Sequence, residues 1–154
     1  RRQDEKTDAP SLYLLVNNLS RFRDLRKADD DFGFSSFGED KPASPAAQFA
    51  GTLREGPEFG IHTLLWCDTY NNVSRSIDRQ GLRDLEMRVL FQMNAADSSN
   101  LIDTPAASHL GVYRAIFYDE GQGRLEKFRP YGLPSEPWLE QVGEQLQKRP
   151  RGQP

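Results

Sequence analysis

Two adjacent asparagines that follow an apolar segment are the residues whose type and position bear most directly on chemistry. The segment Leu12–Val16 is apolar at every position, and Asn17 and Asn18 come directly after it. In nucleotide hydrolases, an apolar strand of this kind usually ends in two acidic residues. One carboxylate holds Mg²⁺ through its water shell, and the other polarises the attacking water. An amide accepts hydrogen bonds but carries no charge and cannot act as a base. The pair therefore indicates either a nucleotide hydrolase that has lost its chemistry or an unrelated strand.

The other candidate groups favour structural roles. No nucleophile-elbow pattern accompanies His62 and His109, which argues against a hydrolase triad, and we expect His62 to be a packed, hydrogen-bonded core residue. The acidic run at 29–31 does not continue into a calcium-loop pattern and predicts a solvated loop, so no metal site is expected. Cys67 is the single cysteine, which excludes an intrachain disulfide and a thiolate zinc site. We interpret it as a small buried hydrophobe at a strand end.

Bulk composition limits the classes of function. The 154 residues suit one domain with a continuous core, and a mean hydropathy of -0.73 indicates a polar globular chain. With 20 basic and 23 acidic residues the net charge is -3, so the chain as a whole lacks the basic footprint of a nucleic-acid-binding protein. Local basic clusters at 21–27 and 124–129 are interpreted as solvated faces. The short apolar runs predict no membrane span, and the single cysteine favours a cytoplasmic setting.

Hydrophobic periodicity and turn residues predict the elements that position these groups. The apolar segment at 12–16 predicts a strand covered on both faces, hence a parallel sheet. Ser44 and Pro45 predict a helix start, and Gly121 and Gly123 predict a hairpin. In the first half we expect a linker or cut end at 1–10, a strand at 12–16, a short helix or turn at 19–26, a flexible acidic insertion at 28–43, a helix from Ser44 to Gly56 and a strand at 61–67. In the second half we expect a helix at 78–86, a strand at 87–93, a short helix from Thr104 to Leu110, strands at 112–118 and 124–128, a helix opened by Ser135-Glu136-Pro137 and a polar tail at 148–154.

This order predicts an α/β fold with a mostly parallel sheet that ends in a C-terminal antiparallel hairpin. The folded unit is expected to span residues 11–147.

Three segments carry a resemblance to a known family. The apolar strand at 12–16 takes the place of a Walker B strand. The segment from Leu53 to Trp66 contains Gly60-Ile61-His62, like the "GIH" strand that precedes a sensor position. The segment at 88–93, followed by 97–103 and a turn to Gly111, is similar to an "FQV…DSR…LD…LLG" region. In this order, over roughly residues 11–130, the chain resembles the second half of the FtsK/SpoIIIE-type motor domain, a RecA-like DNA-translocase ATPase.

The resemblance implies a partial RecA-like P-loop sheet and a parent protein that binds ATP and Mg²⁺. It also implies a ring of subunits with nucleotide between neighbours, double-stranded DNA as a partner and a cytoplasmic location, with any membrane tether in other segments. Asn17 and Asn18 take the Walker B positions. Cys67 and Asp68 lie near the end of the sensor strand. Candidates for the subunit interface follow the third motif: Asp97, Ser99 and Asp103.

The departures from the family pattern concern the same positions. A phosphate loop of the form GxxxxGKS or GxxxxGKT is absent, so the chain resembles a C-terminal piece whose upstream half is a partner. Cys67-Asp68 stands where the family has a polar residue and a glutamine. Ser99 stands where many members have an arginine, and a hydroxyl cannot stabilise phosphoryl charge as a guanidinium does. Asp97 and Asp103 match, and both are also expected to cap helix starts.

Two functions follow from the resemblance. In the first, the parent is a DNA-pumping ATPase, and this portion supplies the sensor strand, part of a subunit interface and DNA-facing loops. In the second, the chain is a catalytically silent ATPase-like scaffold or regulator, as in a multi-ATPase assembly such as a type VII secretion ATPase. The asparagine pair favours the second, and this piece alone is expected to have no ATPase activity. Without the phosphate-loop strand, which lies beside the sensor strand in the family, we also expect a gap or exposed strand edges.

Overall fold

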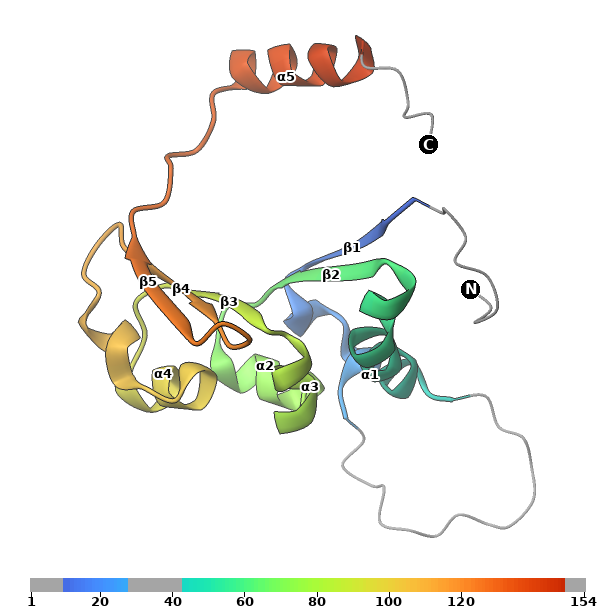
Figure 1. The fold of residues 1–154 in the computed structure, drawn as a ribbon, viewed down its shortest axis with the longest axis vertical. Helices are drawn as coiled ribbons and strands as arrows, with labels where there is room; N and C mark the ends of the chain where they lie inside the picture. Colours follow the sequence, from blue (N-terminus) through green and yellow to red (C-terminus); the bar gives the residue numbers. More distant parts are fainter. Residues whose placement is uncertain (1–9, 28–42, 149–154) are drawn as a thin grey trace, which may run out of the picture.

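The computed structural model describes residues 10–27 and 43–148 (Figure 1). Within these ranges the fold is mixed α/β, with a two-stranded parallel sheet and a separate three-stranded antiparallel sheet. The predicted linker at 1–10, the insertion at 28–43 and the tail at 148–154 lie almost entirely outside the described residues.

The parallel sheet pairs β1 (Leu12–Asn17) with β2 (Ile61–Trp66), in a register that runs from Leu12 opposite Ile61 to Asn17 opposite Trp66. The predicted parallel pairing of these two segments is confirmed. After β1 the chain makes two 3₁₀ turns, η1 (Leu19–Arg21) and η2 (Arg23–Leu25), where the sequence predicts a short helix or turn.

The helix between the parallel strands begins and ends close to its predicted limits. α1 (Pro45–Glu55) has Ser44 as N-cap, whose hydroxyl accepts from the Ala47 amide at 3.2 Å. At Gly56 the helix tightens into the 3₁₀ turn η3 (Gly56–Phe59). A Cβ at Gly56 would lie 2.9 Å from the Ile61 carbonyl oxygen, so the close approach of η3 to β2 requires glycine.

The helix predicted at 78–86 is confirmed in a shorter form, and a second short helix precedes it. α2 (Tyr70–Ser76) was not predicted; Thr69 caps it, and its hydroxyl accepts from the Asn72 amide. α3 (Arg79–Asp84) starts after Asp78, whose carboxylate accepts from the Gly81 amide at 2.7 Å. Each helix has its own N-cap, and this splits the segment between β2 and the next strand.

The second sheet has the order β3-β4-β5 and is antiparallel throughout. Its strands are β3 (Met87–Leu90), β4 (Ala115–Asp119) and β5 (Arg124–Phe128). The predicted hairpin is confirmed. The prediction that the strand at 87–93 joins the parallel sheet is wrong for the described residues, because β3 pairs with β4 in its own sheet. The strand is also shorter, since Asn94 caps a helix, α4 (Ala95–Ile102), soon after Leu90.

β4 starts later than predicted because two residues before it adopt left-handed backbone conformations, Gly111 at φ 76° and Tyr113 at φ 57°. A 3₁₀ turn, η4 (Pro105–His109), stands where a short helix was predicted.

Each sheet has its own hydrophobic cluster on the side that the helices cover. The first cluster is formed by β1, η1, α1 and the end of α2: Val16, Leu19, Phe49, Leu53 and Ile77. The second is formed by β3, α4, η4 and β4: Leu90, Ile102, Ala107, Leu110 and Ile116. Ser98 of α4 is fully buried in the second unit, where its hydroxyl donates to the Thr104 carbonyl at 2.6 Å and accepts from the Ala107 amide at 3.1 Å.

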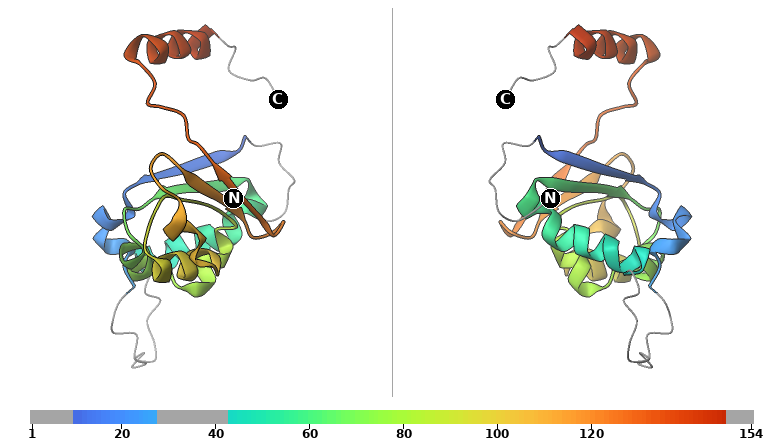
Figure 2. Two further views of the ribbon diagram at one scale, coloured as in Figure 1. Left: turned by 90° about the vertical axis from the view of Figure 1, so that its left-hand side faces the viewer. Right: turned by 90° about the vertical axis from the view of Figure 1, so that its right-hand side faces the viewer.

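The opposite face of both sheets is uncovered in the described structure and presents several large apolar side chains. Helices α1 to α4 lie on one side of the strands, as two perpendicular views show (Figures 1 and 2). The prediction that both faces of the first strand are covered is therefore wrong: Tyr13 is 68% exposed and Leu15 is 69% exposed. His62, expected in the core, is exposed on this face, where its ring lies 5.4 Å from that of Tyr13. The uncovered face also presents Leu64, Trp66, Met87 and Val89.

The last helix stands away from the body of the structure. α5 (Glu136–Lys148) forms as predicted, and an extended segment connects it to β5 (Figure 1). Apolar side chains on this helix are about half exposed: Trp138, Leu139 and Leu146.

Arg88 on β3 joins the two clusters through its guanidinium. The group donates to the carbonyls of Leu82 at 2.6 Å, Leu85 at 3.0 Å and Leu101 at 2.7 Å, and it forms an ion pair with Glu120. Leu82 and Leu85 pack against the first cluster, whereas Leu101 packs against the second. One side chain, only 10% exposed, therefore ties α3 to α4 and to the turn after β4.

Replacement of Arg88 by alanine should lower the free energy of unfolding by roughly 2–4 kcal/mol, because it leaves partly buried carbonyls and a carboxylate without their donor. Arg88→Lys should recover only part of this loss, since an ammonium group lacks the planar fork that reaches three carbonyls. Urea denaturation followed by circular dichroism measures both.

The matched control is Arg124→Ala, which removes an exposed ion pair with Glu126. This variant should unfold at the same urea concentration as the natural chain. Equal destabilisation by the two alanine variants would contradict the role given to Arg88.

Candidate functional site

The predicted site residues of the two parallel strands meet at one edge of the sheet. Because β1 and β2 are parallel and Asn17 lies opposite Trp66, Asn18 and Cys67 both follow the last pair of the ladder. Asp68 comes next, followed by Thr69, the N-cap of α2. The structure thus brings together the two predicted pairs, Asn17 with Asn18 and Cys67 with Asp68.

Asn18 is engaged in the turn that follows β1. Its backbone is left-handed, with φ 62° and ψ 85°, a conformation that asparagine tolerates better than most residues. Its side-chain oxygen accepts from the Ser20 amide at 3.2 Å and from the Ser20 hydroxyl at 2.6 Å. Two donors occupy both lone-pair directions of this oxygen, so the side chain caps η1 and stabilises the turn. A residue in this role does not polarise a water molecule.

Cys67 and Asp68 titrate in opposite directions from their ordinary values. Burial raises the pKa of the Cys67 thiol, and the adjacent Asp68 carboxylate adds to the effect. The hydrogen bond donated by the side-chain Nδ2 of Asn72, at 2.8 Å, lowers the pKa of Asp68. At neutral pH this edge therefore carries a protonated thiol and a carboxylate that is a weak base. Cys67 is less buried than expected: it packs half-buried against the first cluster, and its thiol donates to the Asp68 carboxylate at 3.6 Å.

The three predicted residues on the second unit lie along α4. Asp97 shares a reciprocal pair of hydrogen bonds with Asn94, each at 2.8 Å, so its expected place at a helix start is confirmed. Asp103 is not at a helix start. It is the C-cap of α4, with φ 56°, because the chain must turn there toward η4. Ser99 is half-buried on the same helix.

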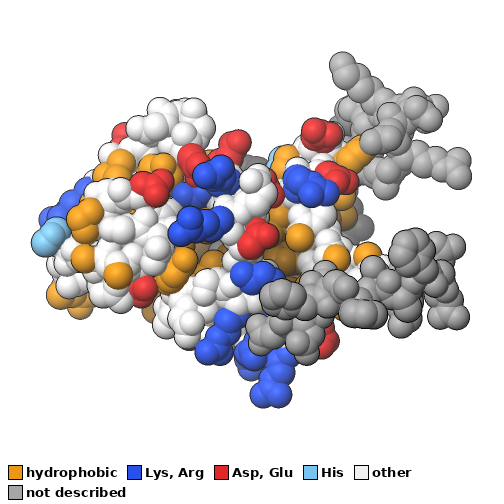
Figure 3. All heavy atoms as spheres, turned by 90° about the horizontal axis from the view of Figure 1, so that it is seen from below, with side chains coloured by type: hydrophobic (Ala, Val, Ile, Leu, Met, Phe, Trp, Pro, Cys, Tyr) orange, Lys and Arg blue, Asp and Glu red, His pale blue; other side chains and the backbone are white. Residues whose placement is uncertain are grey.

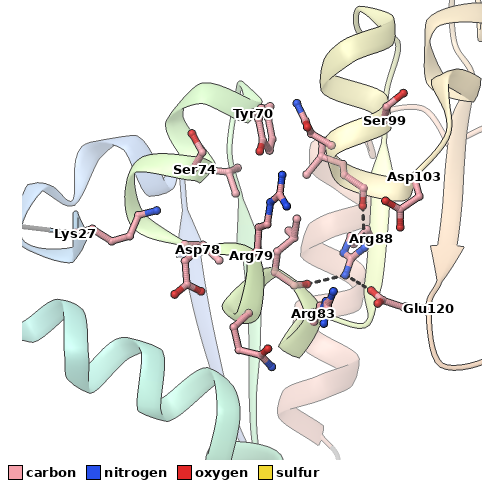
Figure 4. A pocket seen from close by; sticks show the side chains of 16 residues that line it. Lys27, Tyr70, Ser74, Asp78, Arg79, Arg83, Arg88, Ser99, Asp103 and Glu120 are labelled. Atoms are coloured by element: carbon pink, nitrogen blue, oxygen red, sulfur yellow. Dashed lines mark hydrogen bonds and ion pairs between the residues drawn. The ribbon is translucent and has the colours of Figure 1, made fainter. Parts of the chain in front are cut away.

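A cavity of about 630 Å³ lies between α2 and α3 on one side and α4 on the other (Figure 4). Of the predicted residues, Ser99 and Asp103 line it, whereas Asp97 and the four residues at the sheet edge do not. The structure therefore divides the predicted site into two places. Lining residues that the sequence did not single out come from the segment after η2 and from α2 and α3: Lys27, Tyr70, Ser74, Arg79 and Arg83. The i, i+4 spacing of Arg79 and Arg83 within the predicted helix was the available signal.

The charges of this cavity divide into engaged and unengaged groups. Arg88 is fully engaged by carbonyls and Glu120, and Asp78 caps α3. Lys27, Arg79 and Arg83 form no ion pair with any other described residue. Figure 3 shows Lys and Arg side chains gathered across the middle of the helical face seen from below. Asp103 also lines the cavity and forms no ion pair with another described residue, so the unengaged charges are three basic side chains and one carboxylate. This excess of positive charge can hold an anion. No group of three or more metal-ligating side chains occurs in residues 10–27 and 43–148.

Alkylation of Cys67 by iodoacetamide should be slower at pH 8 than that of a thiol in an unfolded peptide. A raised pKa leaves less thiolate at a given pH, and thiolate is the nucleophile. The pH profile of the rate should have its midpoint above the ordinary thiol value. The same chain unfolded in urea serves as the control and should react at the ordinary rate; a native profile centred at or below the ordinary value would refute this account.

Two findings bear on the wider identity of the chain. Within its described part, none of the helices has the length and apolar character that a membrane span requires. No protein-family model, curated protein or solved structure matched the chain.

Proposed function

We propose that the chain is the C-terminal half of a RecA-like module of the FtsK/SpoIIIE type that acts as a scaffold and does not hydrolyse ATP. The observation that carries the proposal is the state of Asn18. The residue at the position of the catalytic base is an amide whose oxygen is committed to the η1 turn. With amides at these positions, the carboxyl end of β1 lacks both the charge that orders Mg²⁺ and the base that activates water.

The unpaired strand edges support the half-module reading. Among the described residues, β2 pairs only with β1, and β3 pairs only with β4. In the family that the chain resembles, the phosphate-loop strand lies between the sensor strand and the strand in the place of β3. A strand supplied by the other half would pair with both free edges and join the two sheets into one.

The uncovered apolar face supports the same reading. α/β sheets of this class carry helices on both faces, because parallel strands are buried on both sides. Crossovers that advance in one direction along a sheet place their helices on one side, which is where α1, α2 and α3 lie. α4, which connects the antiparallel strands β3 and β4, packs on the same side. In the proposed module, helices of the phosphate-loop half cover the exposed side chains of Leu15, Leu64 and Trp66.

ATP turnover tests the proposal. In the parent protein we expect turnover at background with the natural sequence, because an amide pair leaves phosphoryl transfer without its charge and its base. Asn17→Asp/Asn18→Glu restores both carboxylates, and any gain in turnover should require them together. The 154-residue chain alone should show no turnover with either sequence, since it holds no phosphate loop.

Gln141→Glu is the matched control, because it adds a carboxylate at an exposed position of α5, which stands away from the carboxyl ends of β1 and β2 (Figure 1). It should leave turnover at background. Robust hydrolysis by the natural parent protein would overturn the scaffold proposal and favour the DNA-pumping motor instead.

A further inference from the structure

We infer that the cavity between α3 and α4 binds a small phosphate monoester that also carries vicinal hydroxyl groups, the chemistry shared by sugar phosphates and nucleoside monophosphates. This inference does not depend on the proposed function, since it concerns a different place in the fold. The cavity volume of about 630 Å³ falls within the range of small-molecule sites.

Arg79 and Arg83 provide the anion-binding end. They lie one turn apart on α3, so their side chains leave the same face of the helix, and both line the cavity. Figure 4 shows Arg79 directed into the space between α2 and α4. Neither guanidinium has an ion pair among the described residues. Two planar guanidinium groups match the charge and the oxygen geometry of a phosphate dianion.

The remaining charged groups near these arginines leave the anion site intact. Asp78 accepts from the Gly81 amide as the N-cap of α3, and Glu120 is paired with Arg88. The guanidinium of Arg88 donates to three carbonyls and pairs with that carboxylate. It therefore fixes α3 against α4 and adds no unpaired positive charge to the cavity. Lys27 lines the cavity from the other side of α2 and α3 and adds attraction for an anion.

The wall formed by α4 provides the hydroxyl-binding end. Asn100 and Asp103 line it with a carboxamide and a carboxylate, and Ser99 adds a hydroxyl. Carboxylates and amides accept hydrogen bonds from sugar hydroxyls, whereas the Asp103 charge repels a second phosphate group. The cavity therefore favours a ligand that is anionic at one end and hydroxylated at the other, over pyrophosphate or a nucleic-acid backbone.

Titration calorimetry of the 154-residue chain with ribose 5-phosphate and with adenosine monophosphate tests the inference. Inorganic phosphate, ribose and pyrophosphate serve as partial probes and should bind more weakly than ribose 5-phosphate. Tighter binding of adenosine monophosphate assigns a nucleoside phosphate, and equal binding assigns a sugar phosphate. Absence of heat with both esters at millimolar concentration overturns the inference, as does equal affinity for inorganic phosphate and ribose 5-phosphate.

Substitutions separate the two ends of the cavity. Arg79→Ala/Arg83→Ala should weaken binding by about tenfold or more, because two charge-assisted contacts are lost. Asp103→Asn, which tolerates the left-handed backbone, should weaken ribose 5-phosphate several-fold and leave inorganic phosphate unchanged. All three positions are exposed, and circular dichroism confirms that the variants fold.

Arg75→Ala is the matched control, because Arg75 is an exposed arginine of α2 that does not line the cavity. It should change affinity by less than about twofold. An equal loss with Arg75→Ala would show that the chain attracts anions by diffuse charge, which overturns the site. No nucleoside triphosphate or second protein enters these titrations, so their failure leaves the ATP-turnover comparison untouched.

Discussion

The guanidinium of Arg88 holds together two units that share little else. The parallel pair and the antiparallel sheet have separate hydrophobic clusters, and no strand hydrogen bond joins them in the described residues. Arg88 reaches carbonyls at the end of α3, the end of α4 and a carboxylate after β4, and its charge lies 5.5 Å from the centre of the Tyr118 ring. Carbonyls at helix ends need hydrogen-bond donors, and this one side chain donates to such carbonyls in both units. The position of α3 relative to α4 depends on this group.

The same arrangement explains why the two predicted parts of the site lie apart. Parallel strands bring Asn18 and Cys67 to one edge of the first sheet. Ser99 and Asp103 belong to the second unit, which meets the first through α2, α3 and Arg88 and not through the sheet. The cavity is therefore formed between helices, on the covered side of the strands. Its walls are fixed where Arg88 joins them, and two of its free basic side chains, Arg79 and Arg83, lie one turn apart on the short helix α3.

The sequence predicted local elements well where a residue type dictates the backbone. Ser44 and Pro45 start a helix, and Gly121 and Gly123 mark the hairpin, because capping, fixed φ and turn geometry are local properties. It failed where pairing depends on distant segments. The apolar strand at 12–16 predicts burial on both faces, yet in the structure only alternate residues of β1 face the helices. His62 was predicted in the core because its strand, too, was expected to be covered on both faces. The cavity depends on α2 lying beside α4, and no local sequence pattern predicts that contact.

Local charge decides what a surface can bind, and here it runs opposite to the charge of the whole chain. The net charge of the whole chain is -3, which taken alone would disfavour anion binding. This number sums groups that lie on different faces, so it does not describe the charge of any one surface. Residues 19–27 and 70–84, which form adjoining turns and helices, hold seven basic and three acidic residues. The Lys27 amide donates to the Arg75 carbonyl at 2.9 Å, which fixes these two segments side by side. Two of the three acids there, Asp78 and Asp84, accept hydrogen bonds within α3. The carboxyl ends of β1 and β2, in contrast, carry the two amides of Asn17 and Asn18 and the single carboxylate of Asp68. Unpaired positive charge is thus concentrated around the helical cavity, and this makes the cavity, and not the carboxyl ends of β1 and β2, the stronger candidate for a ligand site in the described structure.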